Sequence, residues 1–111
     1  MQQESLTALV RRHLAAATSA SSGRSAHTVY GGREHVLRQT LIALRAGASL
    51  SEHESPGEAT LQVLHGRVTL VAGSDRWSGT PGYLIALPDA RHGLEAVEDS
   101  AVLLTVAMAT T

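Results

Sequence analysis

From Gly23 onward the sequence is divided into short apolar and β-branched runs by turn residues at even intervals. Gly31-Gly32, Gly66 and Pro81-Gly82 are the clearest of these turns. Six runs between the turns are predicted as strands, at residues 27–30, 35–46, 60–65, 67–72, 83–87 and 101–108. Short strands at this spacing are typical of an antiparallel sandwich or barrel. The sequence therefore predicts an all-β domain over residues 23–111.

The first 22 residues have a different pattern, which predicts an amphipathic helix followed by a serine-rich link. Apolar residues and one histidine recur at helical spacing and make one stripe, at Leu6, Leu9, Val10, His13, Leu14 and Ala17. Ser5 is a suitable N-cap, and the helix is expected to end in the segment 19–23. The polar face of the helix carries few cations, so the stripe is expected to pack on its own domain or on a partner subunit.

Composition bounds the possible partners and location. The 111 residues are enough for one hydrophobic core. A net charge of −1 provides no field that would favour nucleic acid or an anionic membrane surface. Because there is no cysteine, the chain has neither disulfides nor thiolate metal sites, and a cytoplasmic location is expected. No apolar run approaches the ~20 residues of a membrane span, so neither nucleic acid nor a membrane is expected as a partner.

Few residues remain as candidates for chemistry. The sequence contains no nucleophile elbow, phosphate-binding loop, dinucleotide glycine fingerprint or zinc-finger spacing, which excludes the commoner enzyme classes. His53 stands between Glu52 and Glu54, just ahead of the break at Pro56-Gly57. It is either a metal ligand that lacks its usual partners or an ordinary loop histidine. His92 is the second candidate, after the turn at Pro88.

The spacing of glycines and histidines resembles the two motifs of the cupin family. Those motifs read G-x5-H-x-H-x3,4-E-x6-G and G-x5-P-x-G-x2-H-x3-N. The residues that agree in order and spacing are Gly47, His53, Gly66, Gly82, Pro88 and His92, the last one position early. Over about residues 35–108 the chain is similar to a small single-domain cupin of the conserved-barrel (cupin 2) type. The resemblance implies a double-stranded β-helix, or jelly-roll barrel, preceded here by the short N-terminal helix.

The resemblance also implies a metal site of three histidines and a glutamate, but the motif is degenerate in this sequence. His53 and His92 match, whereas Ser55 takes the place of the second histidine and Ala59 that of the glutamate. Glu58 is a candidate third ligand, although strand alternation directs it to the opposite face. Two imidazoles are fewer than the three protein ligands typical of catalytic sites. A metal-free site and a site with one divalent ion therefore stay as alternatives.

In the family register, several aliphatic side chains point into the barrel beside the two histidines. The predicted ligand-binding residues are His53, His92, Ser55, Leu61, Val63 and Leu94. An apolar pocket with a few polar groups is the usual small-molecule site, although a small barrel can also be filled by its own side chains. The leading interpretation is a non-catalytic or sensor-like protein that binds a small, largely apolar metabolite. The alternative is a metal-dependent oxygenase or isomerase with His53 and His92 as ligands.

Two further expectations concern geometry and assembly. The matching motif positions converge in cupins, so the imidazoles of His53 and His92 are expected to approach one another at the barrel mouth, with no glutamate between them.

The resemblance implies two-fold dimers. The run Val102–Val106 is apolar on both faces and the helix carries an apolar stripe, and both need burial. A homodimer is therefore expected.

Overall fold

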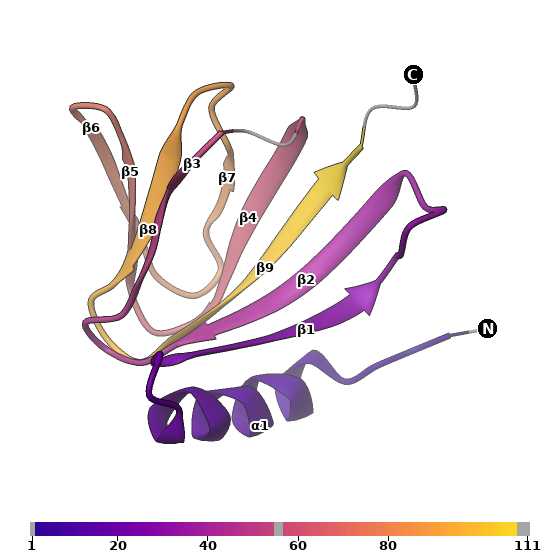
Figure 1. The fold of residues 1–111 in the computed structure, drawn as a ribbon. Helices are drawn as coiled ribbons and strands as arrows, with labels where there is room; N and C mark the ends of the chain where they lie inside the picture. The colour runs from indigo at the N-terminus through magenta and orange to yellow at the C-terminus, as the bar shows by residue number, and fades with distance from the viewer. Residues whose placement is uncertain (1, 55–56, 109–111) are drawn as a thin grey trace.

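The structure, a computed structural model, describes residues 2–54 and 57–108, which form two antiparallel β-sheets and one helix (Figure 1). The first sheet has the strand order β1-β2-β9-β4-β7, with bounds β1 Arg24–Tyr30, β2 Leu37–Leu44, β9 Ser100–Ala107, β4 Glu58–His65 and β7 Leu84–Ala86. The second sheet has the order β3-β8-β5-β6, with bounds β3 Ser49–His53, β8 His92–Ala96, β5 Val68–Ala72 and β6 Asp75–Gly79. The predicted all-β jelly-roll barrel is confirmed.

The hydrophobic core lies between the two sheets. Alternate residues of each strand point inward, as the period of two requires, and β4 shows this most clearly, with Ala59, Leu61 and Val63 buried. The buried residues that contact one another in the core are Leu44, Leu61, Val63, Val68, Leu70, Leu94, Ala96 and Val102. The buried core of the barrel is therefore aliphatic, and the partly buried Trp77 packs against it.

The helix α1 covers the outer side of the five-stranded sheet at β1 and β2 (Figure 1). It spans Leu6–Ser19, and the Ser5 hydroxyl accepts a hydrogen bond from the Ala8 backbone N–H, as predicted for the N-cap. Leu9 and Ala17, on the face of α1 toward the sheet, are buried. Because α1 packs on its own domain, Leu41 on the outer face of β2 is 0% exposed. Among the described residues, no helix has the length and apolarity needed to cross a membrane.

The serine-rich link forms a hydrogen-bonded turn that leads directly into β1. The Gly23 backbone N–H donates to the Ala20 carbonyl at 3.0 Å, and Gly23 has the left-handed φ of +72° that glycine adopts without strain. The Arg45 guanidinium donates to the carbonyls of Ala20, at 3.1 Å, and Thr18, at 3.4 Å. Arg45 directly follows β2, so these bonds fix the end of α1 against the loop after β2 and hold the helix on the sheet.

Three of the nine strands in the described residues were not among the predicted runs: β3, β6 and β8. Each has only five residues, and polar side chains or glycine make up much of its sequence, as in SLSEH of β3. All three belong to the four-stranded sheet, whose outer face meets solvent, so an apolar run is not needed to form them. These three strands matter for function, since two of them carry the histidines.

Candidate functional site

The two histidines singled out by the motif lie side by side. His53 is the last residue of β3 and His92 is the first of β8, and the two are partners across this strand pair. Their ring centroids are 4.8 Å apart, with the ring planes inclined by 60°. His92 is 4% exposed, whereas His53 is exposed. The predicted approach of the two imidazoles is confirmed.

A glycine lets the two strands come close enough for this contact. A Cβ atom at Gly93 would stand 2.8 Å from the Leu50 carbonyl oxygen, closer than real Cβ atoms come to backbone. The pairing of β3 with β8 also shifts register between Leu50 and His53. Such an irregularity redirects a side chain at a strand end. The pair therefore depends on Gly93 and on the local shift as well as on the histidines themselves.

Backbone carbonyls fix the orientation and the tautomer of both rings. His92 Nδ1 lies 2.9 Å from the Ala90 carbonyl oxygen, and His53 Nδ1 lies 3.1 Å from that of Ser51. A carbonyl oxygen only accepts, so in each neutral ring Nδ1 carries the proton and Nε2 carries the lone pair. Within the described residues, neither Nε2 has a hydrogen-bond partner. The site thus offers two free acceptor nitrogens on adjacent rings.

The cavity at the two rings is small. Its volume is about 30 Å³, which leaves room for roughly one or two water molecules. Of the aliphatic residues predicted for the site, Leu61 and Leu94 line this cavity, whereas Val63 is buried in the core away from it. Ser55 lies outside the described residues. The barrel interior is therefore filled largely by its own side chains, the second of the two arrangements that the sequence left open.

The donor set does not match the metal site that the cupin motif implies. Glu58 is exposed on β4 and its neighbour Ala59 is buried, so Glu58 faces away from the barrel interior. In the described part of the chain, no three histidine, cysteine or acidic side chains gather closely enough to hold an ion. His53 and His92 are the two remaining donors, one short of the usual minimum for a catalytic metal. Glu58 is thus not placed to act as a third ligand.

Arg91 borders the histidine pair, although no motif or spacing points to it. Its guanidinium donates to the Glu52 carbonyl at 3.2 Å and pairs with the Glu54 carboxylate at 3.3 Å. Both partners flank His53, so these contacts connect the end of β3 to the loop before β8. They are exposed and contribute little stability, but they hold His53 beside His92.

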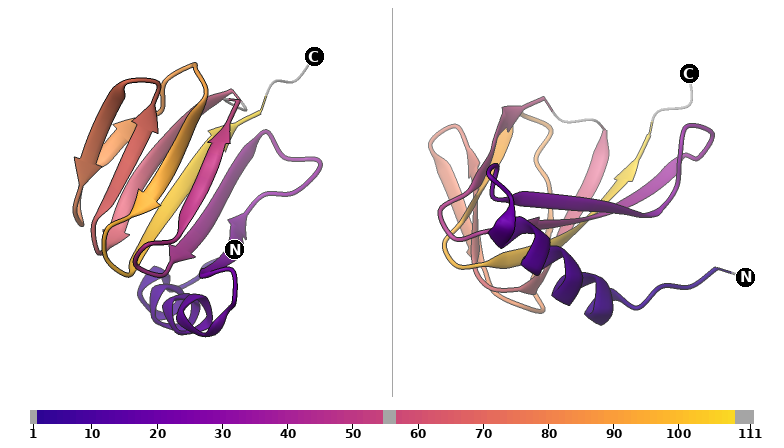
Figure 2. Two further views of the ribbon diagram at one scale, coloured as in Figure 1. Left: turned by 60° about the vertical axis from the view of Figure 1, so that its left-hand side comes forward. Right: turned by 60° about the horizontal axis from the view of Figure 1, so that its bottom comes forward.

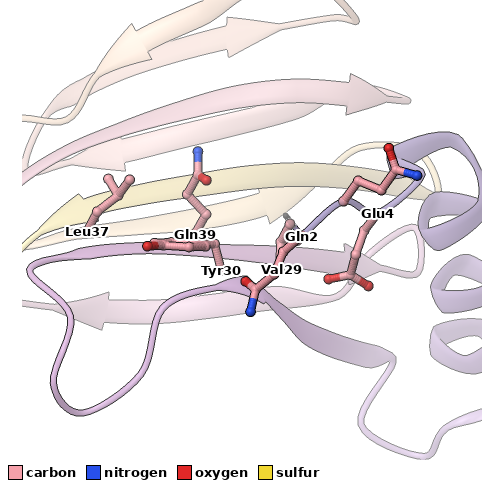
Figure 3. A pocket seen from close by; sticks show the side chains of 7 residues that line it. Gln2, Glu4, Val29, Tyr30, Leu37 and Gln39 are labelled. Atoms are coloured by element: carbon pink, nitrogen blue, oxygen red, sulfur yellow. The ribbon is translucent and has the colours of Figure 1, made fainter.

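A larger and more open groove lies on the other side of the five-stranded sheet, between the N-terminal segment and β1 (Figure 3). Its volume is about 680 Å³, and its lining residues include Glu4, Val29, Tyr30, Leu37 and Gln39. The N-terminal segment extends from the start of α1 toward the same side of the molecule as the turn between β1 and β2 (Figure 2, right). Of its lining residues only Glu4 and Tyr30 are titratable, and Glu4 is already paired with His27, so the barrel mouth remains the candidate site.

A second group of histidines joins the N-terminal segment, α1 and β1 near this groove. His27 Nε2 lies 3.0 Å from Glu4 Oε1, and His13 Nδ1 lies 2.7 Å from the Ser25 hydroxyl. The rings of His13 and His27 have centroids 5.3 Å apart. Burial lowers the pKa of His13, and the positive charges of His27 and Arg12 lower it further. His13 is therefore a packing residue of the helix, as its position on the apolar stripe indicated.

Comparison with known proteins gives matches by structure. No protein-family model matches the chain, and no curated protein matches it. A conserved protein of unknown function from Streptococcus pyogenes has a TM-score of 0.73 and 25% identity, over 83% of this chain and 80% of that one. An RmlC-like cupin from Desulfovibrio desulfuricans has a TM-score of 0.66 and 26% identity, over 76% and 81%. A cupin-superfamily protein from Desulfitobacterium hafniense has a TM-score of 0.70 and 15% identity, over 78% of each chain.

These neighbours share the fold of the chain, which itself carries His53 and His92 as partners across the strand pair β3 and β8. The chain therefore has the fold of a small cupin domain.

Proposed function

We propose that this cupin is a non-catalytic binding module whose ligand is held at the barrel mouth by the neutral imidazoles of His53 and His92. The observation that supports this most is the state of the two rings. Each Nδ1–H donates to a backbone carbonyl, which leaves both Nε2 atoms as acceptors beside the same cavity. A pair of fixed acceptors selects a ligand with a hydrogen-bond donor, such as a hydroxyl or an amine.

The size of the cavity limits what can enter. About 30 Å³ admits a hydroxyl, an amino or a methyl group but not a whole metabolite. The apolar part of the ligand would then stay at the mouth, against Leu50 and Leu87, which line the cavity beside the histidines. The ligand predicted on this basis is a small, largely apolar molecule that ends in one donor group.

A sensor role has support among the structural neighbours. An HTH_3 family transcriptional regulator from Vibrio cholerae has a TM-score of 0.67 and 22% identity to this chain, over 78% of this chain and 52% of that one. In that protein a domain with this fold forms part of a regulator. A domain that binds a small molecule without converting it would suit the same purpose here.

Metal-dependent catalysis is the second candidate, because both rings are oriented as metal-ligating histidines usually are, with Nδ1–H on a carbonyl and Nε2 free. A salicylate 1,2-dioxygenase from Pseudoaminobacter salicylatoxidans, solved as gentisate adducts, shares the fold with 19% identity and a TM-score of 0.69, over 80% of this chain and 26% of that one. The donor set argues against this candidate. Two imidazoles without a third ligand among the described residues do not fit a catalytic ion.

The proposal is tested by nitrogen-15 NMR of the histidine rings in the full chain at about pH 8, where imidazoles are mainly neutral. We expect the Nδ1–H tautomer at both His53 and His92. Butan-1-ol should shift both Nε2 resonances, whereas its isomer methyl propyl ether, which has no donor, should not. His65, exposed at the end of β4, is the internal control. Equal responses to the alcohol and the ether, or the opposite tautomer at either ring, would contradict the proposal.

A further inference from the structure

A groove opens where the two sheets end beside one another. β6 is the last strand of the four-stranded sheet and β7 the last of the five-stranded sheet, and no pairing joins them. The groove between them has a volume of about 220 Å³ and is walled by Leu70, Ala72, Trp77, Ile85 and Pro88. Leu70 is the one residue that it shares with the lining of the histidine cavity. It is therefore a distinct place on the barrel.

The indole of Trp77 is held in position at this groove. A Cβ atom at Gly79 would come 2.3 Å from the ring, so the ring lies directly over the glycine backbone. Tyr83 contacts the ring edge to face, with centroids 6.3 Å apart. Trp77 is half-buried and is the only tryptophan in the sequence. A ligand that contacts the Trp77 ring therefore does not have to order this side chain, which would cost conformational entropy.

A carboxylate lies next to this aromatic ring. Asp75 is two residues before Trp77 on β6, so the two share the face that borders the groove. Within the described residues, the Asp75 carboxylate has no hydrogen bond and no ion pair. Arg76, which also lines the groove, pairs with Glu95 at 3.4 Å. Asp75, Arg76 and Glu95 together carry one negative charge in excess, so the net charge at this edge of the groove is negative.

We propose that this groove is a second binding site, for a small amine with one ring or a short branched chain as its apolar part. An apolar body fits against Leu70, Ile85 and Pro88, and an ammonium group is attracted both by the Asp75 carboxylate and by the face of Trp77. A volume of about 220 Å³ is smaller than the roughly 300–1,000 Å³ of sites for drug-sized ligands. The ligand is therefore of single-ring size.

Fluorescence of Trp77 provides a direct test in the full chain, because no other tryptophan contributes. Three probes share one apolar body and differ in charge: phenethylamine, 2-phenylethanol and 3-phenylpropionate. We expect all three probes to change the fluorescence of Trp77. The dissociation constant of phenethylamine should be about tenfold lower than that of 3-phenylpropionate, which corresponds to a difference in binding free energy of ~1.4 kcal/mol. The preference should weaken as salt is added, since the site is partly exposed.

Variants separate the parts of the site. Asp75→Asn should bring the amine and the acid to within about twofold of one another and leave 2-phenylethanol unchanged. Ala86→Leu, at an exposed position that lines the groove, should weaken all three probes by filling the space. His53→Ala is the matched control at the other site and should leave every Trp77 titration unchanged. Thermal unfolding of each variant confirms that it is folded.

Each outcome decides the proposal. The proposal is supported if the amine preference disappears in Asp75→Asn and persists in His53→Ala, and if Ala86→Leu weakens the binding of all three probes. No perturbation of Trp77 by phenethylamine at millimolar concentration overturns it. A preference that survives in Asp75→Asn overturns the assignment of the carboxylate, and loss of the signal in His53→Ala shows that the probes bind at the histidine pair instead.

Discussion

At the scale of single residues, the state of two imidazoles determines what the barrel mouth can bind. While both rings are neutral, their Nε2 atoms accept hydrogen bonds. Protonation of both would place two like charges at adjacent rings whose centroids are 4.8 Å apart. Acid therefore changes the pair from an acceptor into a cationic group.

This predicts opposite pH dependences for two probes. Between about pH 8 and pH 5, the range in which imidazoles ordinarily gain protons, butan-1-ol should bind several-fold more weakly and butyrate several-fold more tightly. Both affinities can be followed by the ring nitrogen shifts of His53 and His92. Affinities that do not change with pH for either probe would show that the ligands do not contact the rings.

His13 leads to a prediction about stability. Its pKa is lowered in the folded chain by burial and by the charges of His27 and Arg12, so the unfolded chain binds a proton more readily. The free energy of unfolding should therefore fall as the pH drops below about 6.5, the ordinary pKa of histidine. The contribution of His13 to this fall should end below its lowered pKa in the folded chain. The comparison of variants isolates the contribution of His13.

Urea unfolding of the wild-type chain and of His13→Gln at pH 7.5 and 5.5 measures this effect. The loss of stability between the two pH values should be smaller in the variant, because glutamine does not titrate. His65→Gln, at an exposed position on β4, serves as the control and should behave as the wild type. Identical losses in His13→Gln and the wild type would contradict the prediction.

At the scale of strands, the approach of β3 to β8 brings the histidine pair together. Gly93→Ala would place a methyl group against the Leu50 carbonyl, and backbone cannot move aside as a side chain can. We expect a loss of ~1–3 kcal/mol of stability and the loss of contacts between the His53 and His92 rings in NMR. Ser49→Ala, exposed at the start of β3, should change neither. Retention of the ring contacts in Gly93→Ala would refute this role for the glycine.

How much was predictable differs between elements for physical reasons. The strands of the five-stranded sheet bury apolar side chains against the core or the helix, so their sequences are recognisable, whereas β3, β6 and β8 face solvent on one side and resemble loops. His53 and His92 were found through motif spacing. The hydrogen bonds that orient their rings, and the close packing at Gly93, involve backbone atoms and leave no trace in the sequence. The groove at Asp75 and Trp77 was not predicted, because β6 was not recognised as a strand.

At the scale of the molecule, apolar surface gathers beside the open groove of Figure 3. Large apolar side chains exposed there include Tyr30, Val36 and Leu37, at 39%, 49% and 43%. We propose that a second copy of the chain covers this region, as the family resemblance implies for small cupins. β1 is also an unpaired edge of the sheet, which natural proteins seldom leave uncovered.

The assembly is tested by light scattering coupled to size-exclusion chromatography at micromolar concentration. We expect a dimer. Removal of residues 2–22 takes α1 off the sheet and exposes Leu41 and Ala43, so it should lower solubility or weaken the dimer. A chain that stays monomeric and soluble with and without these residues would contradict the prediction.

If His53 and His92 form a metal-free binding pair, the full chain carries no stoichiometric ion, and metal analysis of the purified protein measures this. The chain should be purified without chelator and without added metal, and its content of divalent ions measured by plasma mass spectrometry alongside His53→Ala. We expect far less than one ion per chain, with no difference between the two proteins. One ion per chain in the wild type that disappears in His53→Ala would contradict it.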